Sequence, residues 1–192
     1  GNFWSYADAT EVIAHRIGDD IRGLDPRDID RIWNSAYRKY SFRSPAVTAV
    51  LSAIDMALWD IKGKALGKSI HELLGGAQKR IRTYIAGGYY AEGKGLEELQ
   101  AEVQFNVEEL HASAVKIKIG DPNVGVAGDM LRVEATRKAI GDGGTLMVDA
   151  NCALDLKKSM EFARLLPEYD VYWFEEPLPI HNYEEHGKLA EA

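Results

Sequence analysis

Hydrophobic residues recur at helical spacing through the N-terminal part of the chain. After Pro45, apolar side chains return every three or four residues and form one broad stripe, carried by Val47, Val50, Leu51, Ile54, Leu58 and Ile61. This spacing is typical of an amphipathic helix that packs through one face. Gly63 is the expected C-cap of this helix, because glycine readily adopts the left-handed conformation that ends many helices.

Two further helices are predicted on either side of this one. Asp25 before Pro26 indicates an N-cap followed by proline at the first helical position, and that helix is expected to run to about Tyr37. A short helix follows the long one, since Ser69 and Glu72 have the spacing of a capping box and two glycines come soon after.

From residue 82 onward, short strand-like runs alternate with longer helical patterns. The expected strands cover residues 82–86, 114–119, 145–150 and 171–174. The expected helices cover residues 96–111, 126–140 and 156–166, and a last one starts near residue 183. This repeated alternation of strand and helix predicts parallel β/α units.

A repeat of about thirty residues per unit is typical of a (β/α)8 barrel. We therefore predict an α/β fold, with a helical part over residues 1–79 and the first half of a TIM-type barrel over residues 80–192. An open, doubly wound sheet is the alternative, but no glycine fingerprint follows the first strand. Because closure needs about eight strands, the remaining strands are expected to lie outside these residues.

Composition and charge exclude several classes of function. Hydrophobic residues make up 46% of the chain and charged residues 28%, which is ordinary for a folded protein. The net charge of −7 argues against nucleic acid or an anionic membrane as a partner, because both attract clustered positive charge. No apolar run approaches membrane-spanning length, and the single cysteine excludes an internal disulfide framework, so a cytoplasmic location is expected.

Two lysines lie on one face of the second predicted strand. Lys116 and Lys118 point one way, and the alternating apolar side chains point the other way. A parallel strand is normally apolar on both faces, because other elements cover it on each side. In a barrel the apolar face would meet the outer helices, and the lysines would point inward near the C-terminal mouth, where barrel active sites lie. The alternative is an edge strand with a solvated lysine face.

Carboxylates end the next two predicted strands. Asp149 closes an apolar run, and Asn151 lies on the same face two residues later. Glu175 and Glu176 close an aromatic run just before Pro177. Taken alone, the first motif could be a strand-end turn and the second the acidic start of a helix.

The three motifs together predict a site for metal-assisted proton abstraction. Oxygen ligands with room for water suit Mg²⁺, so Asp149 and Glu175 are the candidate ligands. Lys118 is the candidate base, because a neighbouring ammonium from Lys116 and a divalent cation both disfavour a charged lysine. The metal would also polarise a substrate carboxylate and stabilise the ene-diolate that proton loss leaves.

These residues resemble the enolase superfamily, specifically its mandelate racemase-like branch. Residues 52–64 look like the helix of the family's α+β capping domain, whose helical part alone is expected here. Lys116-Ile117-Lys118 looks like the Lys-x-Lys motif of the second barrel strand. Asp149-Ala150-Asn151 and Glu175-Glu176-Pro177 look like the ligand motifs of the third and fourth strands. The muconate-cycloisomerase branch more often has Glu-Gln-Pro in the last motif, so Glu176 favours the racemase and sugar-acid dehydratase branch.

The resemblance implies a Mg²⁺-dependent acid-sugar dehydratase or racemase, a lyase or isomerase of carbohydrate acid catabolism. A lysine or histidine base combined with Mg²⁺ is general in the superfamily. Lys118 would take the proton next to the substrate carboxylate, and Lys116 would tune Lys118 and contact that carboxylate. Asp149 and Glu175 would hold Mg²⁺.

Asn151 and Glu176 are further candidates that the resemblance implies, for substrate contact and for support of the metal ligands. The expected partner is a small carboxylate, either a sugar acid or a 2-hydroxy acid. The complete protein is expected to be a homo-oligomer.

Two alternative functions fit the same residues. The first is a cycloisomerase or dipeptide epimerase of the muconate-cycloisomerase branch. The second is a non-catalytic truncated chain, since the sequence starts at Gly1 and ends within a predicted helix. The third metal ligand and a His–Asp acid/base pair belong to later strands of the family fold, so these 192 residues alone are expected to be inactive.

Overall fold

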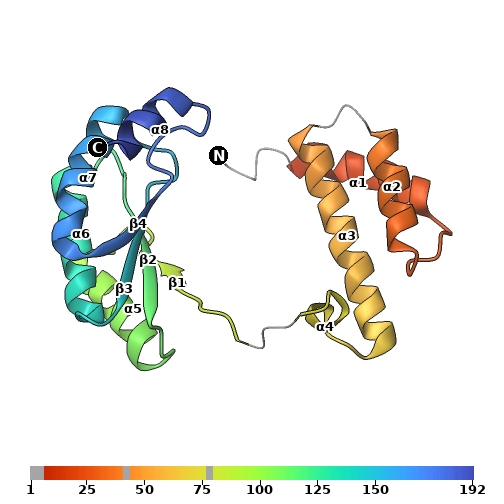
Figure 1. Ribbon diagram of the computed structural model, residues 1–192, viewed down its shortest axis with the longest axis horizontal. Helices are drawn as coiled ribbons and strands as arrows, with labels where there is room; N and C mark the ends of the chain where they lie inside the picture. Colours follow the sequence, from red (N-terminus) through yellow and green to blue (C-terminus); the bar gives the residue numbers. More distant parts are fainter. Residues whose placement is uncertain (1–6, 41–43, 77–79) are drawn as a thin grey trace. The chain divides into compact units, whose positions relative to one another are not determined.

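The computed structural model describes residues 7–40, 44–76 and 80–192, with side chains described from residue 10 onward (Figure 1). Contacts within the chain divide it into two compact units, Gly1–Ile81 and Arg82–Ala192. The domain boundary expected between residues 79 and 80 adjoins residues 77–79, which lie outside the described residues.

The first unit is a set of helices built on one long helix. α3 (Pro45–Leu66) packs against α1 (Ala7–Ile21) and α2 (Ile29–Lys39), and a short α4 (Ile70–Leu73) follows. Two apolar clusters hold the helices together, one around Ile17, Ala36, Val50 and Leu51 and the other around Ile29, Ile32 and Leu58. The predicted stripe on α3 therefore supplies buried side chains to both clusters, although its last member, Ile61, is exposed.

Two helix boundaries differ from the prediction. Asp25-Pro26 does not start a helix, because the Asp25 carboxylate accepts hydrogen bonds from the backbone and side chain of Arg27 in a turn, and α2 begins at Ile29. Gly63 does not end α3, which continues to Leu66 and is capped by left-handed Gly67.

Gly63 is instead required by a close approach of the chain. A Cβ atom at Gly63 would lie 2.9 Å from the carbonyl oxygen of Lys68. The predicted capping box of the next helix is confirmed, since the Ser69 and Glu72 side chains each bond to the other residue's backbone N–H.

The second unit contains a parallel sheet with its strands in chain order. β1 (Ile85–Gly87), β2 (Ala114–Lys118), β3 (Thr145–Asp149) and β4 (Val171–Glu175) pair in the order β1-β2-β3-β4. The connecting helices are α5 (Leu96–Glu108), α6 (Gly125–Ile140) and α7 (Leu156–Leu165), and α8 (Tyr183–Ala190) follows β4.

This order identifies the wall of a β/α barrel. A doubly wound sheet reverses its strand order at a switch point, whereas each strand here lies beside the next one in the chain. Helices α5, α6 and α7 all lie along one face of the sheet (Figure 1). The fold class predicted from the sequence is therefore confirmed.

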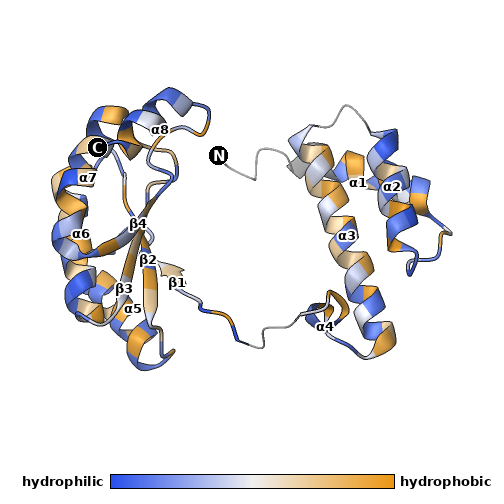
Figure 2. Ribbon diagram, in the orientation of Figure 1, coloured by the Kyte–Doolittle hydropathy of each residue, from blue (hydrophilic) through white to orange (hydrophobic). Residues whose placement is uncertain are grey.

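The core of the second unit lies between the sheet and these helices. Apolar side chains at every second position of the strands, such as Val115 and Ile117, pack against Leu99, Val133 and Phe162 from the helices. Figure 2 shows mixed hydrophobic and hydrophilic residues along each helix, as expected when one helical face is buried. No helix among the described residues is long and apolar enough to cross a membrane.

The strand and helix limits differ slightly from the prediction. β1 begins at Ile85 rather than at residue 82, because Ile85 pairs with Val115 and β2 itself begins at Ala114. α7 ends at Leu165, one residue before the predicted end, and Pro167 lies in the short 3-10 turn that follows, Leu166–Tyr169. β4 extends to Glu175, so the candidate ligand there belongs to the paired strand.

Candidate active site

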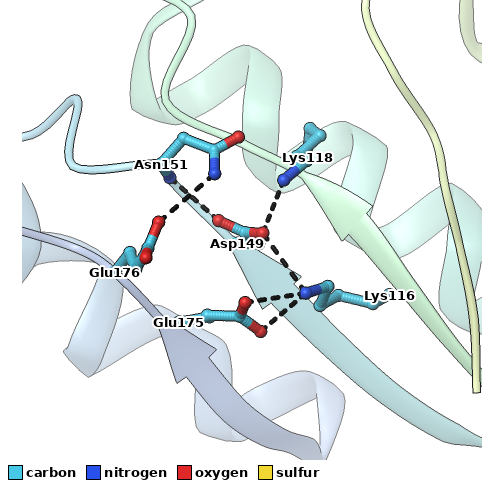
Figure 3. A network of polar contacts seen from close by, with 6 residues as sticks. All are labelled: Lys116, Lys118, Asp149, Asn151, Glu175 and Glu176. Carbon is cyan, nitrogen blue, oxygen red and sulfur yellow. Dashed lines mark hydrogen bonds and ion pairs between the residues drawn. The ribbon is translucent and has the colours of Figure 1, made fainter. Parts of the chain in front are cut away.

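The carboxyl ends of β2, β3 and β4 bring four charged side chains together (Figure 3). Lys118 lies opposite Asp149 in the sheet register, and Asp149 lies opposite Glu175. Lys116 precedes Lys118 by two residues on the same strand and therefore shares its face. The structure thus gathers both predicted lysines and both predicted ligands at one edge of the sheet.

The four side chains form a continuous ionic network. The Lys118 ammonium lies 2.5 Å from Oδ2 of Asp149, and the Lys116 ammonium lies 3.3 Å from the same oxygen. Lys116 also donates to both carboxylate oxygens of Glu175, at 2.8 and 2.7 Å. Asp149 is therefore shared by the two lysines, and Lys116 is shared by the two carboxylates.

Burial makes this pairing necessary. Lys116 and Asp149 have 8% and 2% of their surface exposed, and a buried charge is costly unless it is paired. Burial alone lowers the pKa of Lys116, but hydrogen bonds, above all to Glu175, outweigh that effect and raise the pKa above its ordinary value. Burial likewise raises the pKa of Asp149, but the hydrogen bond from Lys118 and neighbouring donors bring it below its ordinary value. Both groups are therefore charged at neutral pH.

The two carboxylates fit part of a Mg²⁺ site. Asp149 and Glu175 both contact the Lys116 ammonium, so the two side chains already converge on a single cation. Carboxylate oxygens are the ligands that Mg²⁺ prefers, and the ion usually keeps several waters and uses only one or two protein carboxylates. Among residues 10–40, 44–76 and 80–192, no group of three or more His, Cys, Asp and Glu side chains could hold a metal ion. The donors present thus supply two ligands and leave the other positions to water, substrate or further groups.

Asn151 and Glu176 lie beyond the strands, in the turns that follow them. Their φ angles are both +45°, and that of Cys152 is +61°, a left-handed region that few residues other than glycine adopt. β3 ends at Asp149, so the alternation of side chains along a strand does not extend to Asn151. The prediction that Asn151 shares the face of Asp149 therefore does not follow from the strand. The Asn151 N–H instead donates to Oδ1 of Asp149 at 2.9 Å, and the Asn151 amide donates to Glu176 at 3.3 Å.

The strained turns are tied to each other by their backbones. The Cys152 N–H donates to the Glu176 carbonyl oxygen at 2.7 Å, and the Leu154 N–H donates to that of Pro177 at 3.1 Å. Strained backbone of this kind persists only where the surroundings fix it, and it concentrates at functional sites. The two turns therefore form one rigid rim beside Asp149 and Glu175.

Aromatic rings next to both lysines were not predicted. The Lys116 ammonium lies 5.1 Å from the centre of the Tyr84 ring, and the Lys118 ammonium lies 5.7 Å from that of Tyr89. Trp173 on β4 packs edge-on against Tyr84, with ring centres 5.5 Å apart. In the sequence, the cluster of tyrosines around the first strand was the only signal of these contacts.

Two family models match the chain. Residues 5–75 match the N-terminal domain of the mandelate racemase / muconate lactonizing enzyme family, and residues 98–192 match the enolase C-terminal domain-like family. The matched residues fall in the helical unit and in the β/α unit, respectively.

Several curated relatives are named as sugar-acid dehydratases. Arabinonate dehydratase of Saccharolobus solfataricus is 34% identical over 189 residues, which cover 96% of this chain and 50% of that protein. Other relatives include galactarate and galactonate dehydratases and a cycloisomerase. The chain spans about half the length of the curated relatives it matches.

Solved structures share the fold of this chain. A 3,6-anhydro-D-galactonate cycloisomerase from Zobellia galactanivorans superposes with a TM-score of 0.85 at 32% identity, covering 96% of this chain and 51% of that one. An L-talarate dehydratase from Polaromonas sp. JS666, complexed with Mg and L-glucarate, superposes with a TM-score of 0.81 at 32% identity, covering 95% of this chain and 50% of that one.

Proposed function

Because the chain belongs to the mandelate racemase / muconate lactonizing enzyme family of the enolase superfamily, we propose that the protein abstracts the proton next to a substrate carboxylate, with Lys118 as the base. One observation carries the proposal. Lys116 and Lys118 converge on the Asp149 carboxylate at the carboxyl ends of adjacent parallel strands, where barrel enzymes have their active sites.

Each charged side chain has a separate role in this reaction. Lys118 accepts the proton through the lone pair of Nζ, and the electron pair of the broken C–H bond moves toward the substrate carboxylate to give an enolate. Lys116 keeps its positive charge beside the two carboxylates and provides a cation where the substrate carboxylate becomes more negative.

Asp149 and Glu175 would hold Mg²⁺, supported by the Asn151 N–H on Oδ1 of Asp149 and by the contact of Asn151 with Glu176. When bound, Mg²⁺ supplies Lewis-acid polarisation of the substrate carboxylate. The solved talarate dehydratase with Mg and L-glucarate supports both the metal and the substrate class.

The substrate that we propose is a sugar acid, and the reaction is its dehydration. The relatives that act on arabinonate, galactarate and galactonate support this choice. Loss of a β-hydroxyl from the enolate gives the dehydrated product. Reprotonation of the enolate on the opposite face would instead give the racemised substrate, which is the reaction of a racemase. A cycloisomerase is the second candidate, because the superposed Zobellia enzyme performs that reaction.

Exchange of the substrate α-proton with solvent deuterium tests the base directly. In the protein as encoded by its complete gene, Lys118→Ala should abolish exchange into a sugar acid such as galactonate. Lys157→Ala, which removes an exposed lysine on α7, is the matched control and should leave exchange at the wild-type rate. Undiminished exchange in the Lys118 variant would refute the assignment.

A further inference from the structure

The loop after β1 carries an aromatic ring to the side chain of the proposed base. The Tyr89 ring centre lies 5.7 Å from the Lys118 ammonium, within the range of cation–π attraction. Tyr89 nevertheless keeps 54% of its surface exposed. The Tyr89 ring thus covers one side of Lys118, while the exposed part of the ring is open to a bound molecule.

The residue before Tyr89 is held from both sides. The Gly88 N–H donates to Glu102 of α5 at 2.9 Å, and the Gly88 carbonyl oxygen accepts from Arg132 of α6 at 2.5 Å. The φ angle of Gly88 is +60°, and a Cβ atom there would lie 2.7 Å from the Ile117 side chain. Only glycine allows the loop to pass so close to β2, so the start of the Tyr89 loop is fixed.

The residue after Tyr89 is anchored as firmly. The Tyr90 hydroxyl donates to Asp129, and the Arg132 guanidinium lies 4.1 Å from the Tyr90 ring centre. Asp129 also accepts from the Gly120 N–H at 2.7 Å, just past the end of β2. Tyr89 therefore stands between two fixed neighbours.

The anchoring residues of α6 are buried charges. Asp129 is fully buried and Arg132 is 5% exposed. Arg132 reaches the Lys118 carbonyl oxygen at 3.5 Å as well as the Gly88 carbonyl, so the same residue contacts the loop and the strand that carries the base. Buried ion pairs add little to stability compared with apolar packing, but they can specify one arrangement of the chain.

We propose that Tyr89 is a further residue of the active site, whose ring holds the Lys118 side chain and borders the substrate, and that Tyr90, Asp129 and Arg132 position it. The proposal rests on the proposed role of Lys118 as the base. Tyr89 would add an aromatic contact to the substrate that the charged side chains at the strand ends do not provide.

Substitution of Tyr89 tests the ring in catalysis. Tyr89→Ala should lower kcat for α-proton exchange about tenfold or more, because small displacements of a reacting group can cost about a hundredfold. Tyr89→Phe keeps the ring and should recover most of that loss. Phe105→Ala removes a ring of equal exposure, 54%, from the outer helix α5 and should leave the rate unchanged. A rate within about twofold of wild type for Tyr89→Ala, or a Phe variant as slow as the Ala variant, would overturn the proposal.

A second measurement does not depend on activity. In protein labelled with 13C-lysine, the Lys118 ε-methylene protons should be shifted upfield by the Tyr89 ring, and Tyr89→Ala should remove that shift. Lys118→Arg assigns the signal. An unchanged Lys118 signal in Tyr89→Ala would show that the ring does not hold the base. If the wild-type protein showed no Lys118-dependent proton exchange, the proposed function would fail, but this spectrum would still decide the contact.

Tyr90→Phe tests the positioning residues by removing a single hydroxyl. The variant should speed amide hydrogen exchange over residues 88–95 and lower kcat more than it changes KM. Thr136→Val is the matched control, because the buried Thr136 hydroxyl donates only within α6, to the Arg132 carbonyl oxygen at 2.8 Å. The control should lower thermal stability without opening the loop. If the two variants had equal amide exchange over residues 88–95 and equal kcat, Tyr90, Asp129 and Arg132 would have a structural role only, and their proposed positioning role would be overturned.

Discussion

At the residue scale, Asp149 is the group on which the ionic network of the second unit depends. Its Oδ2 atom lies within ion-pair distance of both lysine ammonium groups, while its Oδ1 atom accepts the Asn151 N–H. Loss of the Asp149 charge would leave Lys116 with Glu175 as its one carboxylate partner in the described network and would leave Lys118 with none there.

Asp149→Asn should therefore destabilise the protein. Breaking a buried ion pair by removing one partner costs about 3–5 kcal/mol, so the free energy of unfolding in urea should fall by about 3 kcal/mol. Glu134→Gln, which removes an exposed i,i+4 pair with Lys138 on α6, is the control and should change it little. Equal effects of the two substitutions would mean that the buried network does not stabilise the fold.

The pH dependence of stability should follow from the same pair when a chelator is present. The pKa of Asp149 is held below its ordinary value of 3.8, so its contribution is complete above that pH and is lost as the pH falls through the folded-state pKa. The pKa of Lys116 is raised above 10.5, so its contribution is complete below that pH and is lost as the pH rises through the folded-state pKa. Asp149→Asn should flatten the acid side of the stability profile and Lys116→Met the alkaline side. A variant profile parallel to that of wild type would contradict this.

At the element scale, the loop after β1 and helix α6 act together. β1 itself has only three residues, Ile85–Gly87, and hydrogen bonds that join Gly88 and Tyr90 to side chains of α5 and α6 fix the chain beyond it. The placement of the loop thus depends on helices that follow it in the chain rather than on strand pairing alone.

Alanine substitutions at two glycines of this loop should distinguish the cost of a left-handed backbone from the cost of a steric clash. Gly93 has a φ angle of +74°, and a Cβ atom added there would meet no other atom within 4 Å, so Gly93→Ala should cost only the left-handed conformation, about 1 kcal/mol. Gly88→Ala adds a clash with Ile117 and should cost about 1–3 kcal/mol more, measured by thermal or urea unfolding. Equal costs at the two positions would show that β2 and the loop are not in close contact.

At the scale of the whole molecule, the chain joins a helical unit to four parallel strands with their helices. The half of a barrel wall seen here already contains a lysine pair and two carboxylates at one edge. A ligand that binds only the folded state raises stability by mass action.

Mg²⁺ should therefore raise the unfolding temperature of the protein, and the effect should grow with concentration. At a free concentration of about 100 times Kd, linkage predicts about 2.7 kcal/mol of added stability. Glu175→Gln and Asp149→Asn should each weaken this effect, whereas Glu134→Gln should retain it. A Mg²⁺ response that survives both site substitutions would place the ion elsewhere.

The amino-acid sequence by itself determined the alternation of strand and helix, the opposite faces of β2 and the carboxylates at the ends of β3 and β4. These features are local, because side-chain direction along a strand and the residue at its end follow from neighbouring positions. The family resemblance also came from such short motifs. Local reasoning was wrong where tertiary contacts intervened, as at Gly63, where the approach of the Lys68 carbonyl explains the glycine within the helix.

Only the tertiary structure decided which individual side chains pair within the predicted site and which groups around it make contact. Lys116 and Glu175 are 59 residues apart, and the register of β2, β3 and β4 brings them into contact. The Tyr90–Asp129 contact spans 39 residues and requires α6 to pack beside the loop after β1. Such contacts depend on how separate elements align in space, and residue spacing along one strand or helix does not encode that alignment.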